Sequence, residues 1–123
     1  RITAFRVWNP SPAYTRLETR IPGADTNPYL AMAVALASGL YGIKNKLPLN
    51  IPATAGNGYL DNNNGKISSN LFDAATIMKD SKVAKELFGE AFVEHFVQTR
   101  LWECKQFAKS VTDWELKRYF EII

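Results

Sequence analysis

The sequence has very few of the side chains that build disulfides and zinc sites. It contains one cysteine, Cys104, and one histidine, His95. A single cysteine cannot form a disulfide within the chain, so nothing points to a disulfide-stabilised secreted fold, and a reducing, cytoplasmic setting is expected. One cysteine and one histidine also fall short of a zinc-ligand cluster. Both side chains are therefore expected to be ordinary helix residues.

Long apolar stretches are also missing. No uncharged apolar run reaches the ~18 residues that a membrane-spanning helix needs, so no membrane partner is expected. At 46% hydrophobic and 22% charged residues, the 123-residue chain has the composition of one globular domain with a core. It has no initiator methionine and begins inside a strand-like run, which predicts a fragment of a longer protein.

The excess of positive charge is confined to one short segment. Residues 21–123 carry eleven basic and eleven acidic side chains, which balance. Residues 1–20 carry one acidic side chain, Glu18, and four arginines: Arg1, Arg6, Arg16 and Arg20. Nucleic-acid-binding proteins more often spread lysine and arginine along a stripe with exposed aromatics, so no nucleic-acid partner is expected. Clustered arginines favour small anions, because the planar guanidinium pairs with carboxylate or phosphate through two hydrogen bonds.

The first third of the chain predicts two strands and a buried helix. Residues 2–8 and 14–21 have strand-like composition, and the prolines of Asn9-Pro10-Ser11-Pro12 exclude regular structure between them. Asn27-Pro28 is a typical helix start, with a capping side chain before a proline. Residues 28–43 contain no charge and are rich in Ala and Leu, so this helix is expected to be buried nearly all round.

The rest of the chain predicts a long loop followed by helices. Residues 44–68 contain two prolines and three glycines, and residues 62–65 form an Asn-Asn-Asn-Gly run expected to be an exposed turn. Capping residues then predict three helix starts, at Asn70, at Ser81 and at the Thr112–Glu115 capping box. Together with apolar spacing they predict four helices, over residues 71–79, 82–88, 90–110 and 113–122. The predicted fold class is α+β: an N-terminal antiparallel strand pair, a buried Ala-rich helix and a C-terminal helical cluster.

The pattern Arg16-Leu17-Glu18-Thr19-Arg20 is the strongest candidate for chemistry. Side chains alternate along a strand, so Arg16, Glu18 and Arg20 share one face and a carboxylate lies between two guanidiniums. Such a pattern is also typical of a solvated strand with surface ion pairs. In a phosphoryl-transfer site, the carboxylate would face a hard divalent cation and the arginines would face phosphate or carboxylate oxygens.

An ordered series of motifs resembles a known family. The series is RLETRIPGAD at residues 16–25, NPYLA at 27–31, GLYGI at 39–43, FG at 88–89, FV at 92–93 and VTDWE at 111–115. It closely resembles the C-terminal part of the catalytic domain of the glutamine synthetase family, over nearly the whole chain except residues 44–68. The resemblance implies that residues 1–123 are a single C-terminal portion of such a domain.

The resemblance implies a role for each arginine and for the glutamate. Glu18 matches a ligand of the Mg²⁺ or Mn²⁺ ion nearer the substrate, and Arg20 matches the arginine that binds substrate glutamate. Arg16 matches an arginine beside the ATP phosphates. Arg1 and Arg6 have the R-x4-R spacing of a pair that contacts ATP and the transferring phosphate. Arg1 is also the candidate catalytic residue and a second contact for glutamate.

The reaction implied by this family joins glutamate to an amine. ATP phosphorylates the γ-carboxylate, and the amine then displaces phosphate to leave an amide. The full-length protein is expected to be a homo-oligomer with active sites shared between subunits, and the 123 residues alone are expected to be inactive.

The identity of the amine is left open by the motifs. Ala13 follows Ser11-Pro12 where ordinary glutamine synthetases have a lysine, and IPGAD and LYGI look more like the γ-glutamylpolyamine ligase branch. A polyamine such as putrescine is therefore favoured, with ammonia or another amine as the alternative. A catalytically silent structural relative is the competing hypothesis.

Overall fold

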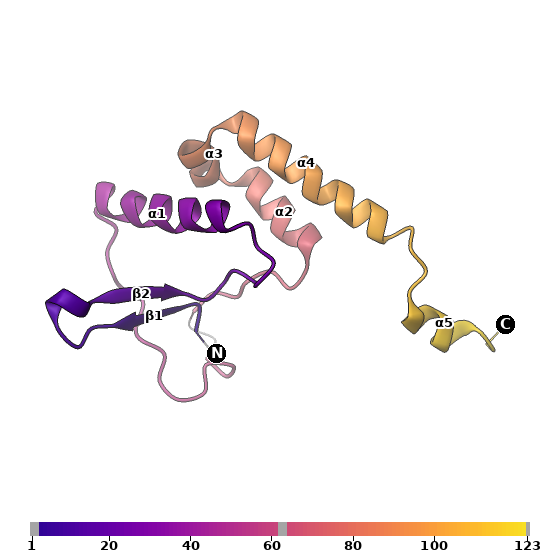
Figure 1. Cartoon of the computed structure of the whole chain (residues 1–123), viewed down its shortest axis with the longest axis horizontal. Coiled ribbons are helices and arrows are strands. Elements are labelled where there is room, and N and C mark those ends of the chain that lie inside the picture. The colour runs from indigo at the N-terminus through magenta and orange to yellow at the C-terminus, as the bar shows by residue number, and fades with distance from the viewer. Residues whose placement is uncertain (1–2, 62–63, 123) are drawn as a thin grey trace. The chain divides into compact units, whose positions relative to one another are not determined.

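The structure, a computed structural model, describes residues 3–61 and 64–122 and confirms the α+β class. Two short strands come first and are followed by α-helices (Figure 1). Contacts between Cα atoms divide the chain into two units, Arg1–Lys66 and Ile67–Ile123. That the whole chain forms one portion of a larger domain stays a prediction.

The two strands form an antiparallel hairpin and are shorter than predicted. Strand β1 is Phe5–Trp8 and strand β2 is Arg16–Thr19, against predicted ranges of 2–8 and 14–21, of which Ile2 lies outside the described residues. The expected start of the second strand at residue 14 is wrong, because Pro12–Tyr14 form a short 3-10 helix, η1.

Side-chain hydrogen bonding closes the connection between the strands. The Thr15 hydroxyl oxygen lies 2.6 Å from Asn9 Oδ1 and 3.1 Å from the carbonyl oxygen of Ser11. Pro12 at the start of η1 supplies a φ angle that suits a helical turn. These local interactions compete with strand pairing, so β2 begins at Arg16.

The register of the hairpin separates charged and apolar side chains. Arg6 pairs with Glu18 and Trp8 pairs with Arg16, so these four side chains lie on one face. The other face is formed by the alternate residues, which are Phe5, Val7, Leu17 and Thr19.

Helix α1 begins as predicted but is not buried. It spans Pro28–Lys44, and the Asn27 side chain accepts hydrogen bonds from the backbone N–H groups of Tyr29 and Leu30 at 3.0 and 3.3 Å. None of its residues is buried, and Tyr29 and Ile43 are 78% and 77% exposed. The expectation of burial all round is therefore wrong for this chain. A helix that is apolar all round needs partners on several sides, and the strands of its unit are only four residues long.

The described residues between α1 and the next helix contain neither helix nor strand, as predicted for residues 44–68 except that α1 extends through Lys44. Asn64 donates a hydrogen bond to Asp61 Oδ2 at 3.0 Å, which ties this segment locally. The predicted turn at residues 62–65 lies partly outside the described residues, because residues 62–63 are not among them.

The second unit contains four helices near the predicted positions. They are α2 at Leu71–Asp80, α3 at Lys82–Phe88, α4 at Glu90–Phe107 and α5 at Asp113–Tyr119. The side chains of Asn70, Ser81 and Thr112 cap α2, α3 and α5 as predicted. Helices α4 and α5 end three residues before their predicted ends at 110 and 122. Beyond Ala108, the backbone N–H groups of Lys109 and Ser110 donate to carbonyl oxygens three residues earlier, not four. These tighter turns satisfy carbonyl groups at the end of α4.

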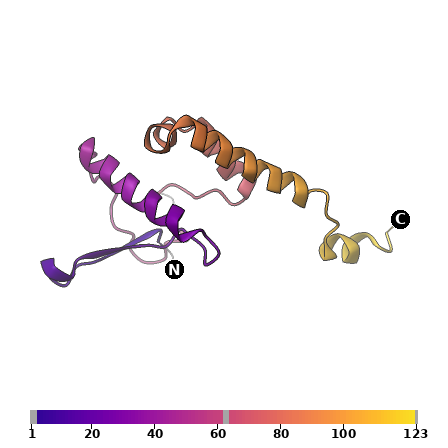
Figure 2. The ribbon, with the colours of Figure 1, turned by 45° about the horizontal axis from the view of Figure 1, so that its top comes forward.

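The core of the second unit lies between α2 and α4. Ala75 on α2 and Val93 and Val97 on α4 are buried, and Figure 2 shows the two helices side by side. Four partly buried residues pack around them: Met78, Ala84, Phe88 and Leu101. The packing of α2 and α3 against α4 therefore centres on three small apolar side chains, with larger apolar side chains around them.

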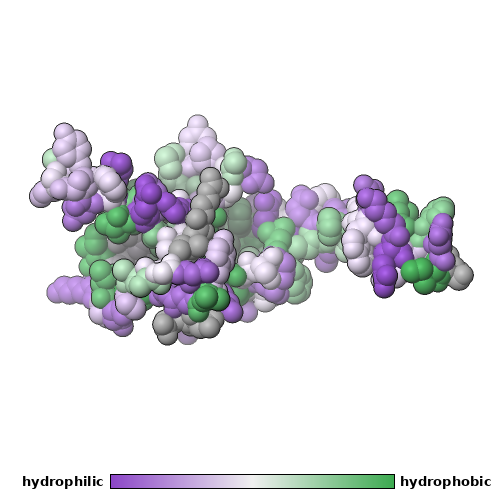
Figure 3. Space-filling view, turned by 90° about the horizontal axis from the view of Figure 1, so that it is seen from below, coloured by the Kyte–Doolittle hydropathy of each residue, from purple (hydrophilic) through white to green (hydrophobic). Residues whose placement is uncertain are grey.

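Many large apolar side chains reach the surface in both units. Figure 3 shows apolar residues in green beside hydrophilic residues in purple. Trp102 and Phe107, for example, are 57% and 71% exposed. Among the described residues, no helix combines the length and the apolar character that crossing a membrane requires.

Replacing Val93 with alanine tests the position of this core. Val93 is fully buried, so Val93→Ala is expected to lower the free energy of unfolding by about 2 kcal/mol through lost burial and a residual cavity. Val111 is 70% exposed, so Val111→Ala should change it by less than about 0.5 kcal/mol. Urea unfolding followed by circular dichroism compares the two variants of the chain. Equal losses would contradict the assigned core.

Candidate functional site

The charged face of the hairpin brings one carboxylate between two guanidiniums. Glu18 Oε1 accepts a hydrogen bond from Arg6 Nη2 at 2.5 Å. Glu18 Oε2 accepts hydrogen bonds from Arg20 Nη2 at 3.2 Å and from Arg20 Nε at 3.4 Å. The two cations beside Glu18 are therefore Arg6 and Arg20. Strand alternation alone had placed Arg16 and Arg20 on either side of it.

The register of the strands explains this arrangement. Arg6 lies directly opposite Glu18 on the neighbouring strand, where side chains on one face are close enough to pair. The backbone N–H of Arg20 donates to the carbonyl oxygen of Ala4 at 2.8 Å, so strand-like pairing continues one step beyond β2. That bond keeps Arg20 on the same face as Glu18.

The charged cluster remains open to solvent. The side chains of Arg6, Glu18 and Arg20 are 49%, 35% and 26% exposed. Desolvation is the largest single influence and raises the pKa of the Glu18 carboxyl. Hydrogen bonds from Arg20 and Arg6, together with the charges of both, outweigh it and hold this pKa below its ordinary value. Glu18 is therefore a carboxylate at neutral pH, and its cations remain accessible to a second anion.

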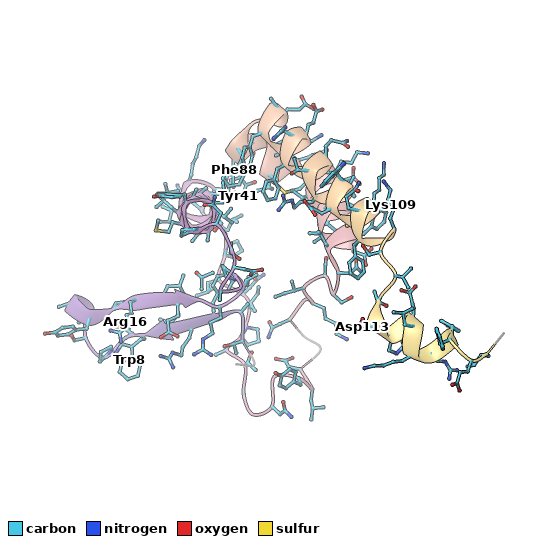
Figure 4. The ribbon with its side chains drawn as sticks, turned by 45° about the vertical axis from the view of Figure 1, so that its right-hand side comes forward. Trp8, Arg16, Tyr41, Phe88, Lys109 and Asp113 are labelled. Atoms are coloured by element: carbon cyan, nitrogen blue, oxygen red, sulfur yellow. The ribbon has the colours of Figure 1, made fainter. Side chains whose placement is uncertain are left out.

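Arg16 has a different partner on the same face. Its guanidinium carbon lies 5.7 Å from the centre of the Trp8 ring, which is within the range of a cation–π contact. Figure 4 labels both residues on the adjacent strands. No role for Trp8 could be predicted from the sequence, because the pairing of residues 8 and 16 depends on the length of the connection between the strands. Knowing the seven-residue connection, 9–15, would have identified the pair.

Four of the five predicted site residues lie among the described residues. Arg6, Glu18 and Arg20 are in direct contact, and Arg16 shares their face without an ion pair to Glu18. Arg1 lies outside the described residues, so its predicted catalytic, glutamate-binding and ATP-binding roles stay predictions.

A divalent cation would find one ligand on this face. Carboxylate oxygens are preferred ligands of Mg²⁺, and an ionised carboxylate can accept about four hydrogen bonds, so three N–H donors do not exhaust Glu18. In the described parts of the chain, no group of three or more His, Cys, Asp or Glu residues could hold a metal ion. Glu18 therefore fits as one ligand of such an ion, and the described residues do not complete a three-ligand group around it.

Replacing Glu18 with glutamine tests which arginines it holds. Glu18→Gln removes the charge that binds Arg6 and Arg20, so the NMR signals of both guanidiniums should shift and their N–H protons should exchange faster. The Arg16 signal should hardly change, because Arg16 lies over Trp8. Glu86→Gln, on the exposed surface of α3, serves as the matched control. A change at Arg16 as large as that at Arg6 would contradict the observed pairing.

Comparison with known proteins finds one matching family model and several similar curated proteins. The family model described as "Glutamine synthetase, catalytic domain" matches residues 1–119. The chain is 44% identical to Type-1 glutamine synthetase 2 of Dictyostelium discoideum over all of this chain and 24% of that protein. It is 43% identical to glutamate–isopropylamine ligase of a Pseudomonas species over all of this chain and 27% of that protein.

A third relative is the γ-glutamylethanolamide synthetase of Streptomyces coelicolor, at 42% identity over 86% of this chain and 22% of that protein. The chain thus spans about a quarter of the length of these curated relatives. The family model covers almost the whole chain, including both strands and every helix named above. The chain therefore belongs to the glutamine synthetase catalytic-domain family.

Proposed function

We propose that this chain is part of an ATP-dependent ligase that joins the γ-carboxyl group of glutamate to an amine. The observation that carries the proposal is the solvent-open charged cluster, in which Arg6 and Arg20 flank the Glu18 carboxylate. Family membership supports the same reaction class.

The proposed roles follow the chemistry of each side chain. Arg20 binds a carboxylate of substrate glutamate, and Arg6 and Arg16 bind the ATP phosphates, because guanidiniums hydrogen-bond to both anions through paired N–H groups. Arg1 joins Arg6 at the transferring phosphate and also contacts glutamate. Since Glu18 neutralises part of the charge of Arg6 and Arg20 and fixes their positions, it sets where the two anions can lie.

Glu18 is also the proposed ligand of a Mg²⁺ or Mn²⁺ ion. When bound, such an ion would neutralise phosphate charge and polarise the phosphoryl oxygens. Glu18 would contribute one hard oxygen ligand, and the hydrogen bonds from Arg6 and Arg20 would hold that ligand in one orientation.

The proposed reaction has two steps that conserve every atom. A γ-carboxylate oxygen of glutamate attacks the terminal phosphorus of ATP, ADP leaves, and γ-glutamyl phosphate forms. The amine nitrogen then attacks the carbonyl carbon, phosphate leaves with that carboxylate oxygen, and the nitrogen loses a proton. Arginines lower the cost of bringing two anions together and keep them aligned for the first step.

We propose that the amine is larger than ammonia. Two relatives above 40% identity are named for isopropylamine and for ethanolamide, and Ala13 stands where ordinary glutamine synthetases have a lysine. Putrescine stays the favoured polyamine, on the resemblance of IPGAD and LYGI. Ammonia is the second candidate, because the relative at 44% identity is named a glutamine synthetase.

We also propose that the full-length protein works in the cytoplasm as a homo-oligomer whose subunits share active sites. The experiment that tests the proposal is phosphate release by the full-length protein, measured with ATP, glutamate and a panel of ammonia, isopropylamine, ethanolamine and putrescine. Release that depends on one amine supports the ligase and names the acceptor. Absence of amine-dependent release would favour a catalytically silent structural relative.

Arg20→Ala tests the assignment of the glutamate site. Losing charge-assisted hydrogen bonds to a substrate carboxylate should raise the KM for glutamate at least about tenfold in the full-length protein, while the KM for ATP changes much less. Steady-state kinetics at saturating concentrations of the other substrate measures both constants. Arg118→Ala, at an exposed arginine of α5, is the matched control. Equal effects on the two KM values would show that the assignment of Arg20 to the glutamate site is wrong.

The 123-residue chain by itself should neither turn over ATP nor bind it with micromolar affinity. Its charged cluster supplies one acidic ligand, and the described residues contain no group that could hold the metal alone. Isothermal titration calorimetry with ATP and Mg²⁺ measures the affinity directly. A dissociation constant in the micromolar range would contradict the expectation that the rest of the site lies elsewhere.

A further inference from the structure

Trp8 lies on the charged face of the hairpin, yet it has none of the roles proposed above. It is paired directly with Arg16 across β1 and β2, and the Arg16 guanidinium carbon lies 5.7 Å from its ring centre. The Trp8 residue is 46% exposed, so its ring is not filling a core. Figure 4 shows both side chains at the hairpin. The face of the ring is therefore available for a cation–π contact with Arg16.

Among the described residues, the contact with Trp8 is the only polar or ring interaction of the Arg16 side chain. Throughout residues 3–61 and 64–122, its guanidinium has neither an ion pair nor a hydrogen bond. Glu18 is already engaged by Arg6 and Arg20. A long arginine side chain without a partner samples many rotamers and loses that freedom when it binds an anion. Contact with a rigid ring reduces the number of rotamers before the anion arrives.

The contact with Trp8 also leaves the hydrogen-bonding groups of Arg16 free. Guanidinium donors point outward in the plane of the group, whereas a cation–π contact uses its charge and flat surface. A carboxylate partner would occupy those donors and neutralise the charge. Trp8 can therefore hold Arg16 while its donors and its charge remain available to phosphate oxygens.

We infer that Trp8 is a positioning residue, which holds the Arg16 guanidinium ready for the ATP phosphates. This inference rests on the proposed function of Arg16 and adds a residue that acts through it. Trp8 itself touches neither substrate in this scheme. Its removal should weaken ATP binding and leave glutamate binding and the chemical step nearly unchanged.

A double-mutant cycle in the full-length protein tests the inference. Trp8→Leu should raise the KM for ATP about two- to fivefold, the range given by an exposed cation–π contact, without a matching change in kcat or in the KM for glutamate. Trp8→Phe keeps a π face and should restore most of the wild-type value. In an Arg16→Gln background, Trp8→Leu should have no further effect, because the contact is already lost.

Three results would contradict the role of Trp8 or the role of Arg16 on which it depends. An unchanged KM for ATP in Trp8→Leu, or an equal rise in the Arg16→Gln background, would show that Trp8 does not act through Arg16. An unchanged KM for ATP in Arg16→Gln itself would refute the proposed role of Arg16, and the inference with it. Trp114→Leu, at an exposed tryptophan of α5, is the matched control. If Trp8→Leu does not fold, Trp8→Met provides an extended apolar side chain without a π face.

Discussion

The antiparallel pairing of β1 with β2 determines which charged side chains of this chain can meet. It sets Arg6 against Glu18 and Trp8 against Arg16, and the bond between Arg20 and Ala4 continues the same pairing. A shift of one residue would turn every side chain of a strand to the opposite face. The charged cluster would then disperse, and Arg16 would lose its aromatic partner. Each proposed role at this site therefore depends on a register that is held by backbone hydrogen bonds and by the closed connection at residues 9–15.

Local chemistry explains why much of the fold could be predicted from the sequence. Asn27, Asn70, Ser81 and Thr112 cap helices where their side chains were expected to do so, since capping depends on neighbouring backbone groups alone. Burial of α1 could not be predicted in the same way, because burial depends on what packs against a helix. For a similar reason, only part of the charged cluster could be predicted from the sequence. Alternation along one strand groups Arg16, Glu18 and Arg20, but the contacts of Arg6 and Trp8 depend on the partner strand.

The charged cluster combines two properties that are useful for joining two anions. Its cations outnumber its single carboxylate, so positive charge remains for incoming phosphate and carboxylate groups. It is also open to solvent, so a substrate can reach it. Charge held in place before the reaction costs no reorganisation during it. In the proposed arrangement Glu18 orders Arg6 and Arg20, and Trp8 orders Arg16 on the same face.

Isotope transfer in the full-length protein shows whether the γ-carboxylate is phosphorylated before the amine attacks. Glutamate labelled with ¹⁸O at both γ-carboxylate oxygens is turned over with ATP and the accepted amine, and the released phosphate is analysed by mass spectrometry. If the γ-carboxylate is phosphorylated and the amine then displaces phosphate, each phosphate carries one ¹⁸O atom and the amide retains the other. Phosphate without the label would contradict the proposed ligase mechanism.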